Sequence, residues 1–93
     1  MDKVIRWDEA KNQLLQLQRS VSFEEVLELI EQGNILNRLM HPNHEKYPHQ
    51  EIFVVEMKSY IWYVPFVETE SEIFLKTIIP SRKLVKEFGG KKQ

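Results

Sequence analysis

The amino-acid sequence predicts an α+β fold of one domain, in which helices pack on one face of a mainly antiparallel sheet. Apolar residues between positions 8 and 33 recur at helical spacing, whereas after position 34 they alternate or cluster as they do in strands. The chain has 93 residues, of which 42% are apolar, and this suits a single domain over residues 1–93 with one modest core. The predicted element order is β-α-α-β-β-β-α.

The first helix is predicted from a cap and a short periodic run. Asp8 is a suitable N-cap residue because its carboxylate can accept a backbone N–H of the first turn. Ala10, Leu14 and Leu17 stand at i, i+4 and i+7, which predicts that these three side chains form the buried stripe. We expect the helix to end near Arg19.

The second helix has a stronger local signature. Ser22 and Glu25 have the spacing of a capping box, in which each side chain bonds the other residue's backbone. Gly33 is expected to close the helix in the left-handed conformation. The linker between the two helices is very short, so they form a helical hairpin. The predicted apolar stripe consists of Phe23, Val26, Leu27 and Ile30.

The β-type patterns predict several short strands and one polar loop. The strands are expected at residues 3–7, 35–40, 52–57, 60–67 and 72–79. The loop covers residues 41–50, and a further turn covers residues 68–71. Lys58-Ser59 joins two strands although it is not a preferred two-residue hairpin turn. Pro65 lacks an N–H group, which predicts an edge position or a bulge.

A last helix is predicted to open at Pro80-Ser81 and to end at Gly89-Gly90. Its apolar residues are Leu84, Val85 and Phe88. The strand predicted at residues 60–67 is rich in aromatic residues. Alternation places Tyr60, Trp62, Val64 and Phe66 on one sheet face, and Ile61, Tyr63 and Val67 on the other. We expect these side chains to form sheet core, although an exposed subset would suit a partner protein.

Composition excludes several classes of protein. The chain contains no cysteine, which rules out disulfide scaffolds, thiol catalysis and zinc ribbons. It has no apolar run of the length that a membrane span needs and no secretory signal at Met1–Arg6, so we expect a cytoplasmic protein without a membrane partner.

Charge is unevenly distributed along the chain, although its net value is −1. Residues 76–93 hold six basic residues and one acidic residue, a net charge of +5, and residues 1–75 hold seven basic and thirteen acidic residues, a net charge of −6. The C-terminal part, including a basic tail from about residue 89, is either a solubilising end or a site for phosphate.

Three segments resemble the BrnT-type toxins of bacterial type II toxin–antitoxin systems. Residues 7–12 (WDEAKN) resemble the W-D-x-x-K-x motif that opens the family, and residues 21–25 (VSFEE) resemble the start of its second helix. Residues 78–83 (IIPSRK) are similar to the family's I-I-S-A-R-R segment. The resemblance implies a RelE-like ribonuclease fold and metal-independent RNA cleavage that inhibits translation, with no cofactor. It also implies a cognate antitoxin, whose complex with the toxin binds operator DNA.

Cleavage of RNA without a metal needs a base, an acid and a cation that stabilises the phosphoryl oxygens. By the resemblance, Arg82 matches the first Arg of the last segment and is the candidate cation, Lys83 matches the second, and Lys11 matches the motif Lys. His49 is the candidate acid or base because it stands nearest to a strand. The residues expected to bind RNA are Lys83, Lys76, Tyr47, Lys46 and Lys86. Four of these residues have a plain structural alternative: a surface ion pair for Arg82, a solvated helix face for Lys11, an exposed loop position for His49 and packing for Tyr47.

Three hypotheses follow for function. The first is a toxin that cleaves RNA, for example after docking to the ribosome, and that an antitoxin neutralises. The second is an interaction module with the same fold but without catalysis, because the chain lacks the family's K-H-G before residue 21 and carries little net charge. The third, least favoured, is a metal-dependent hydrolase that uses the loop histidines His41, His44 and His49.

Overall fold

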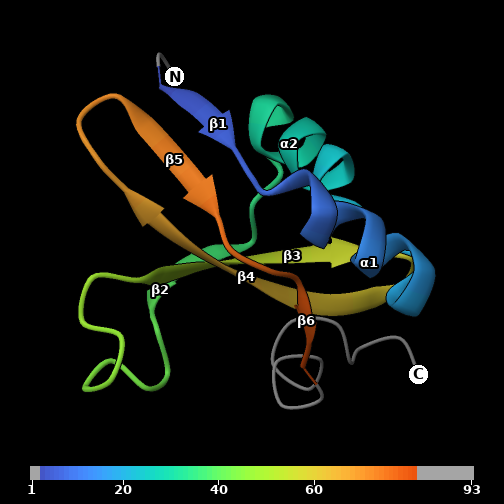
Figure 1. The fold of residues 1–93 in the computed structure, drawn as a ribbon. Helices are drawn as coiled ribbons and strands as arrows, with labels where there is room; N and C mark the ends of the chain where they lie inside the picture. The colour runs from blue at the N-terminus through green and yellow to red at the C-terminus, as the bar shows by residue number, and fades with distance from the viewer. Residues whose placement is uncertain (1–2, 82–93) are drawn as a thin grey trace.

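The computed structural model describes residues 3–81, which form two helices and one mixed sheet (Figure 1). The helices are α1 (Glu9–Arg19) and α2 (Phe23–Gln32). The strands are β1 (Val4–Arg6), β2 (Asn37–Met40), β3 (Glu51–Met57), β4 (Tyr60–Glu68), β5 (Glu72–Leu75) and β6 (Ile79–Pro80). The sheet order is β1-β5-β4-β3-β2, and β6 pairs with β4. The β1–β5 pair is parallel and the other pairs are antiparallel.

This architecture confirms the α+β class and the mainly antiparallel sheet, but it corrects the predicted order. Five strands follow the helices within residues 3–81, whereas the predicted order contained three and the predicted ranges 35–40, 52–57, 60–67 and 72–79 make four. The strand expected at 72–79 is broken: β5 ends at Leu75, and the chain pairs again only at Ile79–Pro80, beside Trp62 and Tyr63 of β4. Pro80 therefore belongs to a strand and the N–H of Ser81 donates to the carbonyl of Ile61 at 3.1 Å, so the predicted helix does not open at Pro80-Ser81; its residues from 82 onward lie outside the described residues.

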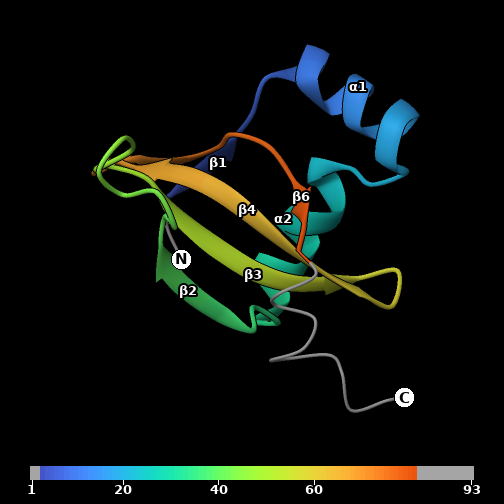
Figure 2. The ribbon, with the colours of Figure 1, turned by 90° about the horizontal axis from the view of Figure 1, so that it is seen from below.

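Both helices cover the same face of the sheet (Figure 2). Leu15 of α1 and Phe23 and Val26 of α2 pack in one buried cluster with side chains of β3, β4 and β5. The sheet residues of this cluster are Phe53, Val55, Met57, Trp62, Val64, Phe66, Ile73 and Leu75. The opposite face holds a smaller cluster of Ile52, Val54 and Ile61, against which Leu39 and Tyr63 pack. The predicted division of the β4 aromatic residues between two faces is therefore confirmed.

The buried stripe predicted for α1 is wrong. Leu14 is 43% exposed and Leu17 is 84% exposed, whereas Asn12 and Leu15 are buried. Asn12 occupies an interior position because its side chain forms hydrogen bonds that link α1 to α2. Its Oδ1 accepts the backbone N–H of Phe23 at 2.8 Å, and its Nδ2 donates to Glu24 Oε1 at 2.8 Å. A polar side chain with its hydrogen bonds satisfied can replace an apolar one in a core.

The predictions for α2 are confirmed at both ends. The Ser22–Glu25 capping box is formed in both directions, and Gly33 adopts φ of 75° at the C-terminus. Phe23 and Val26 are buried, and Leu29 and Ile30 pack against the same cluster.

The β3–β4 hairpin is closed by Lys58 and Ser59, which take φ values of 55° and 60°. Two successive residues with positive φ make the turn that matches the right-handed twist of paired strands, so tertiary packing of the hairpin overrides the poor local preference.

Neither helix of the described chain has the length and apolar character that crossing a bilayer requires.

Pro65 lies inside the sheet and not at an edge, contrary to the prediction. Its β3 neighbour is Ile52, and its carbonyl oxygen accepts the N–H of Lys76 at 2.8 Å. On that side, β4 pairs with β6 at residues 62–63 and with β5 at residues 66–68. Pro65 therefore occupies the gap between two partner strands, where a missing N–H breaks no strand pairing.

Replacing Asn12 should reveal its structural role. Asn12→Ala removes the acceptor of the buried Phe23 N–H, and an unsatisfied buried donor costs about 1–3 kcal/mol. We expect the free energy of unfolding in urea to fall by about 2 kcal/mol. The matched control is Gln13→Ala on the exposed side of α1, and an equal loss in both variants would contradict this role for Asn12.

Candidate functional site

A pocket of about 300 Å³ opens where β2, β3 and β4 meet the loop of residues 41–50. Strand register places Arg38 opposite Phe53, Met40 opposite Glu51, and Glu51 opposite Phe66. These polar residues therefore extend from the helix-covered face, at the end of the sheet that α1 and α2 leave open (Figure 1). The pocket is lined by Arg38, Met40, Pro48, His49, Gln50, Glu51 and Glu68.

Arg38 is held over an aromatic floor. The rings of Phe53 and Phe66 stack with their centroids 4.0 Å apart and an interplanar angle of 8°. The Cζ atom of Arg38 lies 5.0 Å from the Phe66 centroid and 5.9 Å from the Phe53 centroid. A guanidinium at this distance is attracted by the electron-rich ring face, and its flat shape suits stacking on the ring. The floor thus fixes the cation at the mouth of the pocket.

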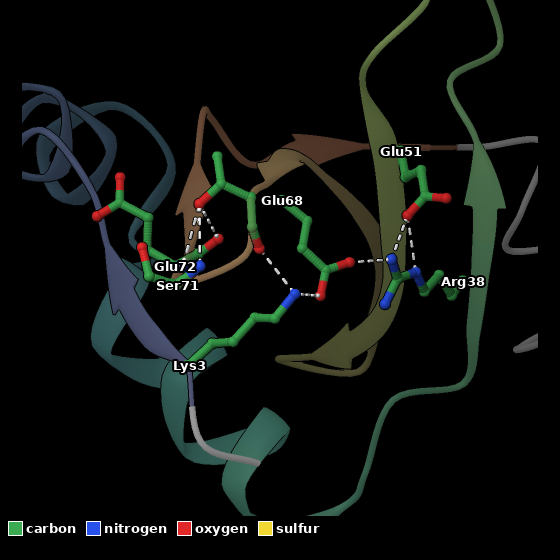
Figure 3. A network of polar contacts seen from close by, with 7 residues as sticks. Lys3, Arg38, Glu51, Glu68, Ser71 and Glu72 are labelled. Atoms are coloured by element: carbon green, nitrogen blue, oxygen red, sulfur yellow. Dashed lines mark hydrogen bonds and ion pairs between the residues drawn. The ribbon is translucent and has the colours of Figure 1, made fainter.

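Two carboxylates hold the Arg38 guanidinium from either side (Figure 3). Its Nε donates to Glu51 Oε1 at 2.8 Å, and its Nη2 forms an ion pair with Glu68. Glu68 also accepts from Lys3 Nζ at 2.6 Å, and the same ammonium donates to the carbonyl of Thr69 at 2.7 Å. The chain of contacts runs from Lys3 beside β1 to Arg38 in β2, which are the two edge strands of the sheet.

This network shifts the ionisation of its members. Hydrogen bonds from Lys3 and Arg38 stabilise the charged form of Glu68 and lower its pKa below the usual value of 4.5. Partial burial disfavours the charge on Arg38, but its hydrogen bonds to Glu68 and Glu51 outweigh this effect and raise its pKa. The lowered pKa of Glu68 and the raised pKa of Arg38 both favour the charged forms of this ion pair.

His49 lies at the rim of this pocket, as an acid or base for the pocket would. It is exposed and forms no hydrogen bond to any of residues 3–81. The loop that carries it is closed by the N–H of His41, which donates to the carbonyl of Gln50 at 3.2 Å. The N–H of Tyr47 donates to the carbonyl of Asn43 at 3.0 Å and the N–H of Gln50 donates to the carbonyl of Tyr47 at 3.2 Å, so backbone hydrogen bonds hold the residues on either side of Pro48 and His49.

Two other predicted residues lie in the same loop. The rings of Tyr47 and His41 are 4.6 Å apart, and Lys46 Nζ lies 5.4 Å from the Tyr47 centroid. Tyr47 is half-buried, which agrees with the packing alternative, and Lys46 is exposed. Within residues 3–81, histidines and carboxylates nowhere gather in a group of three that could hold a metal ion.

The remaining predicted site residues are not brought to this pocket. Lys11 is half-buried on α1, at the other end of the sheet (Figure 1). Lys76 follows β5 and places its Nζ 5.3 Å from the ring of Phe74, which alternates with the core residues Ile73 and Leu75 and so faces the opposite side of the sheet. The positions of Arg82, Lys83 and Lys86 lie outside the described residues.

Sequence reasoning missed Arg38, the cation at the centre of the pocket. Arg38 stands in a short strand with no motif around it, and its partners Glu51 and Glu68 are 13 and 30 residues away. One signal was present: glutamates at the ends of two otherwise apolar strands need cations, and Arg38 is the basic residue of the neighbouring strand.

What the site can do chemically follows from these groups. It combines a fixed planar cation that can bind a phosphate through two N–H groups, carboxylates that can take a proton, and an exposed imidazole.

Comparisons of the chain with family models, with curated proteins and with solved structures find no match.

Removing the charge of Glu68 should change the response of stability to acid. Because the pKa of Glu68 is lowered on folding, its stabilising contribution is present above about pH 4.5 and is lost as the pH falls through the lower folded-state pKa. Glu68→Gln should therefore have a lower free energy of unfolding than the wild type at pH 6, and the difference should shrink at pH 3. Urea unfolding at both pH values measures this.

The control for that experiment is Glu70→Gln, since Glu70 is exposed and forms no ion pair within residues 3–81. If both variants lose the same stability at pH 6, the network does not depend on Glu68.

Proposed function

We propose that this protein is the toxin component of a type II toxin–antitoxin system, with a RelE-like fold, that cleaves RNA without a metal and so inhibits translation. The resemblance of residues 7–12, 21–25 and 78–83 to BrnT-type toxins motivates the proposal. The observation that carries it is the pocket that brings Arg38, His49 and Glu51 together. The protein acts in the cytoplasm, and a cognate antitoxin neutralises it and forms with it the complex that binds operator DNA.

The three groups divide the reaction between them. Arg38 binds the scissile phosphate through its N–H groups and stabilises the charge that develops on the phosphoryl oxygens. Glu51, displaced from Arg38 by the phosphate, takes the proton of the 2′-OH as that oxygen attacks phosphorus. His49 gives a proton to the departing 5′-oxygen, which leaves a 2′,3′-cyclic phosphate and a free 5′-OH. Histidine suits this role because its side chain exchanges protons near neutral pH.

The proposal is tested by cleavage of a labelled RNA in the presence of EDTA. We expect Arg38→Ala and His49→Ala each to lower kcat at least about a hundredfold, the order of magnitude of losing one charge-stabilising or proton-transferring group. Arg6→Ala is the matched control, because Arg6 is an exposed arginine in another edge strand. Arg82→Ala, made in parallel, tests the cation predicted from the sequence.

Expression in bacteria provides an independent readout. The wild type should arrest growth and degrade RNA, whereas Arg38→Ala should not. Harmless expression of the wild type with intact RNA, or full activity of the Arg38→Ala variant, would reject the ribonuclease role of this pocket.

Glu51→Gln separates the two roles of the Glu51 carboxylate. The change removes a competitor for Arg38, so RNA should bind more tightly and KM should fall. It also removes the base, so kcat should fall. A variant in which KM rises and kcat stays constant would show that Glu51 only positions Arg38. Steady-state kinetics on the same RNA give both constants.

A second candidate function is an interaction module without catalysis. It is favoured by the ion pairs of Arg38 with Glu51 and Glu68, which already neutralise the cation that a phosphate needs. In that case the chain would bind its partner, or DNA through the partner complex, and RNA would stay intact in every assay above.

A further inference from the structure

We propose that the edge of β1, together with the groove between β1 and α2, is a docking site for an extended basic segment of a partner protein, which adds to the sheet as a new strand. The inference does not depend on RNA cleavage, because the groove and the Arg38 pocket share no lining residue, although Lys3 of the groove forms an ion pair with Glu68 of the pocket. The groove has a volume of about 400 Å³ and is lined by Lys3, Val4, Ile5, Leu27, Ile30 and Glu31.

The backbone of β1 is open on one side. Among residues 3–81, β1 pairs only with β5, and its place in the strand order is at the end of the sheet. The N–H of Val4 donates to the carbonyl of Ser71 at 3.1 Å, on the β5 side. Because backbone groups alternate in direction along a strand, the N–H and C=O of Ile5 point to the free edge. Such an edge can pair with an added strand.

The side chains beside this edge are apolar. Val4 is 59% exposed and belongs to the exposed large apolar residues of the described chain. Ile5 and Ile30 are half-buried at the border of the core, and Leu27 completes the wall from α2. On an incoming strand, the residues of one face would cover Ile5, Leu27 and Ile30 and a residue of the other face would lie beside Val4, while the backbone pairing would hold the strand in register.

Unpaired glutamates near the groove favour a basic partner. Glu28 and Glu31 are exposed in the last two turns of α2 and form no ion pair within residues 3–81. That helix has no basic residue in its last turn, so two negative charges stand near the negative end of the helix dipole. A lysine or arginine beside the docked strand would relieve this repulsion, and Glu31 itself lines the groove.

The other edge of the sheet is less suited to the same role. In β2, the N–H of Arg38 already donates to the side chain of Asn37 at 2.8 Å, which satisfies that donor locally. Met40 of β2 is 63% exposed, close to the value for Val4, and so provides a matched comparison between the two edges.

The test uses cysteine crosslinking, since the chain has no cysteine of its own. The probe is a synthetic peptide of alternating valine and threonine, with one central cysteine and a lysine at each end. Residues opposite each other on paired strands have Cβ atoms close enough for a disulfide. Full-length Val4→Cys should therefore form the mixed disulfide at least about five times faster than full-length Met40→Cys under mild oxidation.

Three changes define the interaction. Replacing the peptide lysines by glutamate should slow crosslinking to Val4→Cys about fivefold, and adding Glu31→Lys to the protein should slow it about threefold, the range that surface charges give. A peptide N-methylated at alternate residues should lose the effect because it cannot pair with the Ile5 backbone.

Several outcomes would overturn the proposal. Equal rates at Val4→Cys and Met40→Cys would show that the groove has no role, and undiminished crosslinking of the N-methylated peptide would exclude strand addition. If the peptide with glutamate in place of lysine crosslinked as fast as the lysine peptide, the preference for a basic partner would be excluded. Rapid disulfide dimerisation of Val4→Cys without peptide, together with a dimer of the wild type in sedimentation, would assign the edge to a second copy of this chain.

Discussion

The structure depends on burying one face of the β3–β4 hairpin. Its side chains alternate between faces, so Phe53 and Val55 of β3 and Val64 and Phe66 of β4 must be covered together. The helical hairpin covers most of this face, and its position is fixed by Asn12, which links α1 to the first turn of α2. The hydrophobic effect thus sets the arrangement of the layers, and a buried hydrogen bond sets their relative position.

The candidate site arises where this cover ends. Phe53 and Phe66 are at the border of the helix-covered area, and the Arg38 guanidinium lies over their rings in place of a further apolar layer. Glu51 and Glu68 provide counter-charges for this cation. Packing and charge balance therefore explain why a planar cation and two carboxylates share one pocket, whereas the loop of residues 41–50 brings His49 to its rim.

The balance of charges between Arg38 and its carboxylate partners has a consequence for RNA binding and for the interaction-module alternative. A pocket whose charges cancel attracts RNA weakly over long distances, in agreement with the net charge of −1 for the whole chain. Binding of a phosphate at Arg38 must release a carboxylate, and the released group is then a base next to the substrate. If no phosphate binds, the same contacts only join the two edge strands of the sheet through Lys3 and Glu68.

The comparison of the two helices shows where sequence reasoning succeeds. The ends of α2 were predicted correctly because the capping box and Gly33 act within a few residues of each other. The buried stripe of α1 was predicted incorrectly because Leu14 and Leu17 are apolar but face away from the sheet. Asn12 is buried in their place, and its partners are the backbone of Phe23 and the side chain of Glu24. Both partners lie in α2, so the periodicity of apolar residues within α1 could not predict them.

The sequence by itself determined the α+β class, the helix caps, the division of the β4 side chains between faces and the position of His49 beside a strand. These features follow from local rules of capping and alternation. Only the tertiary structure decided that Arg38, Glu51 and Glu68 meet, that Lys11 and Lys76 lie elsewhere, and that Pro65 occupies a gap between β5 and β6. Each of these depends on strand order and register, which bring together residues far apart in the chain and which packing of the whole sheet selects.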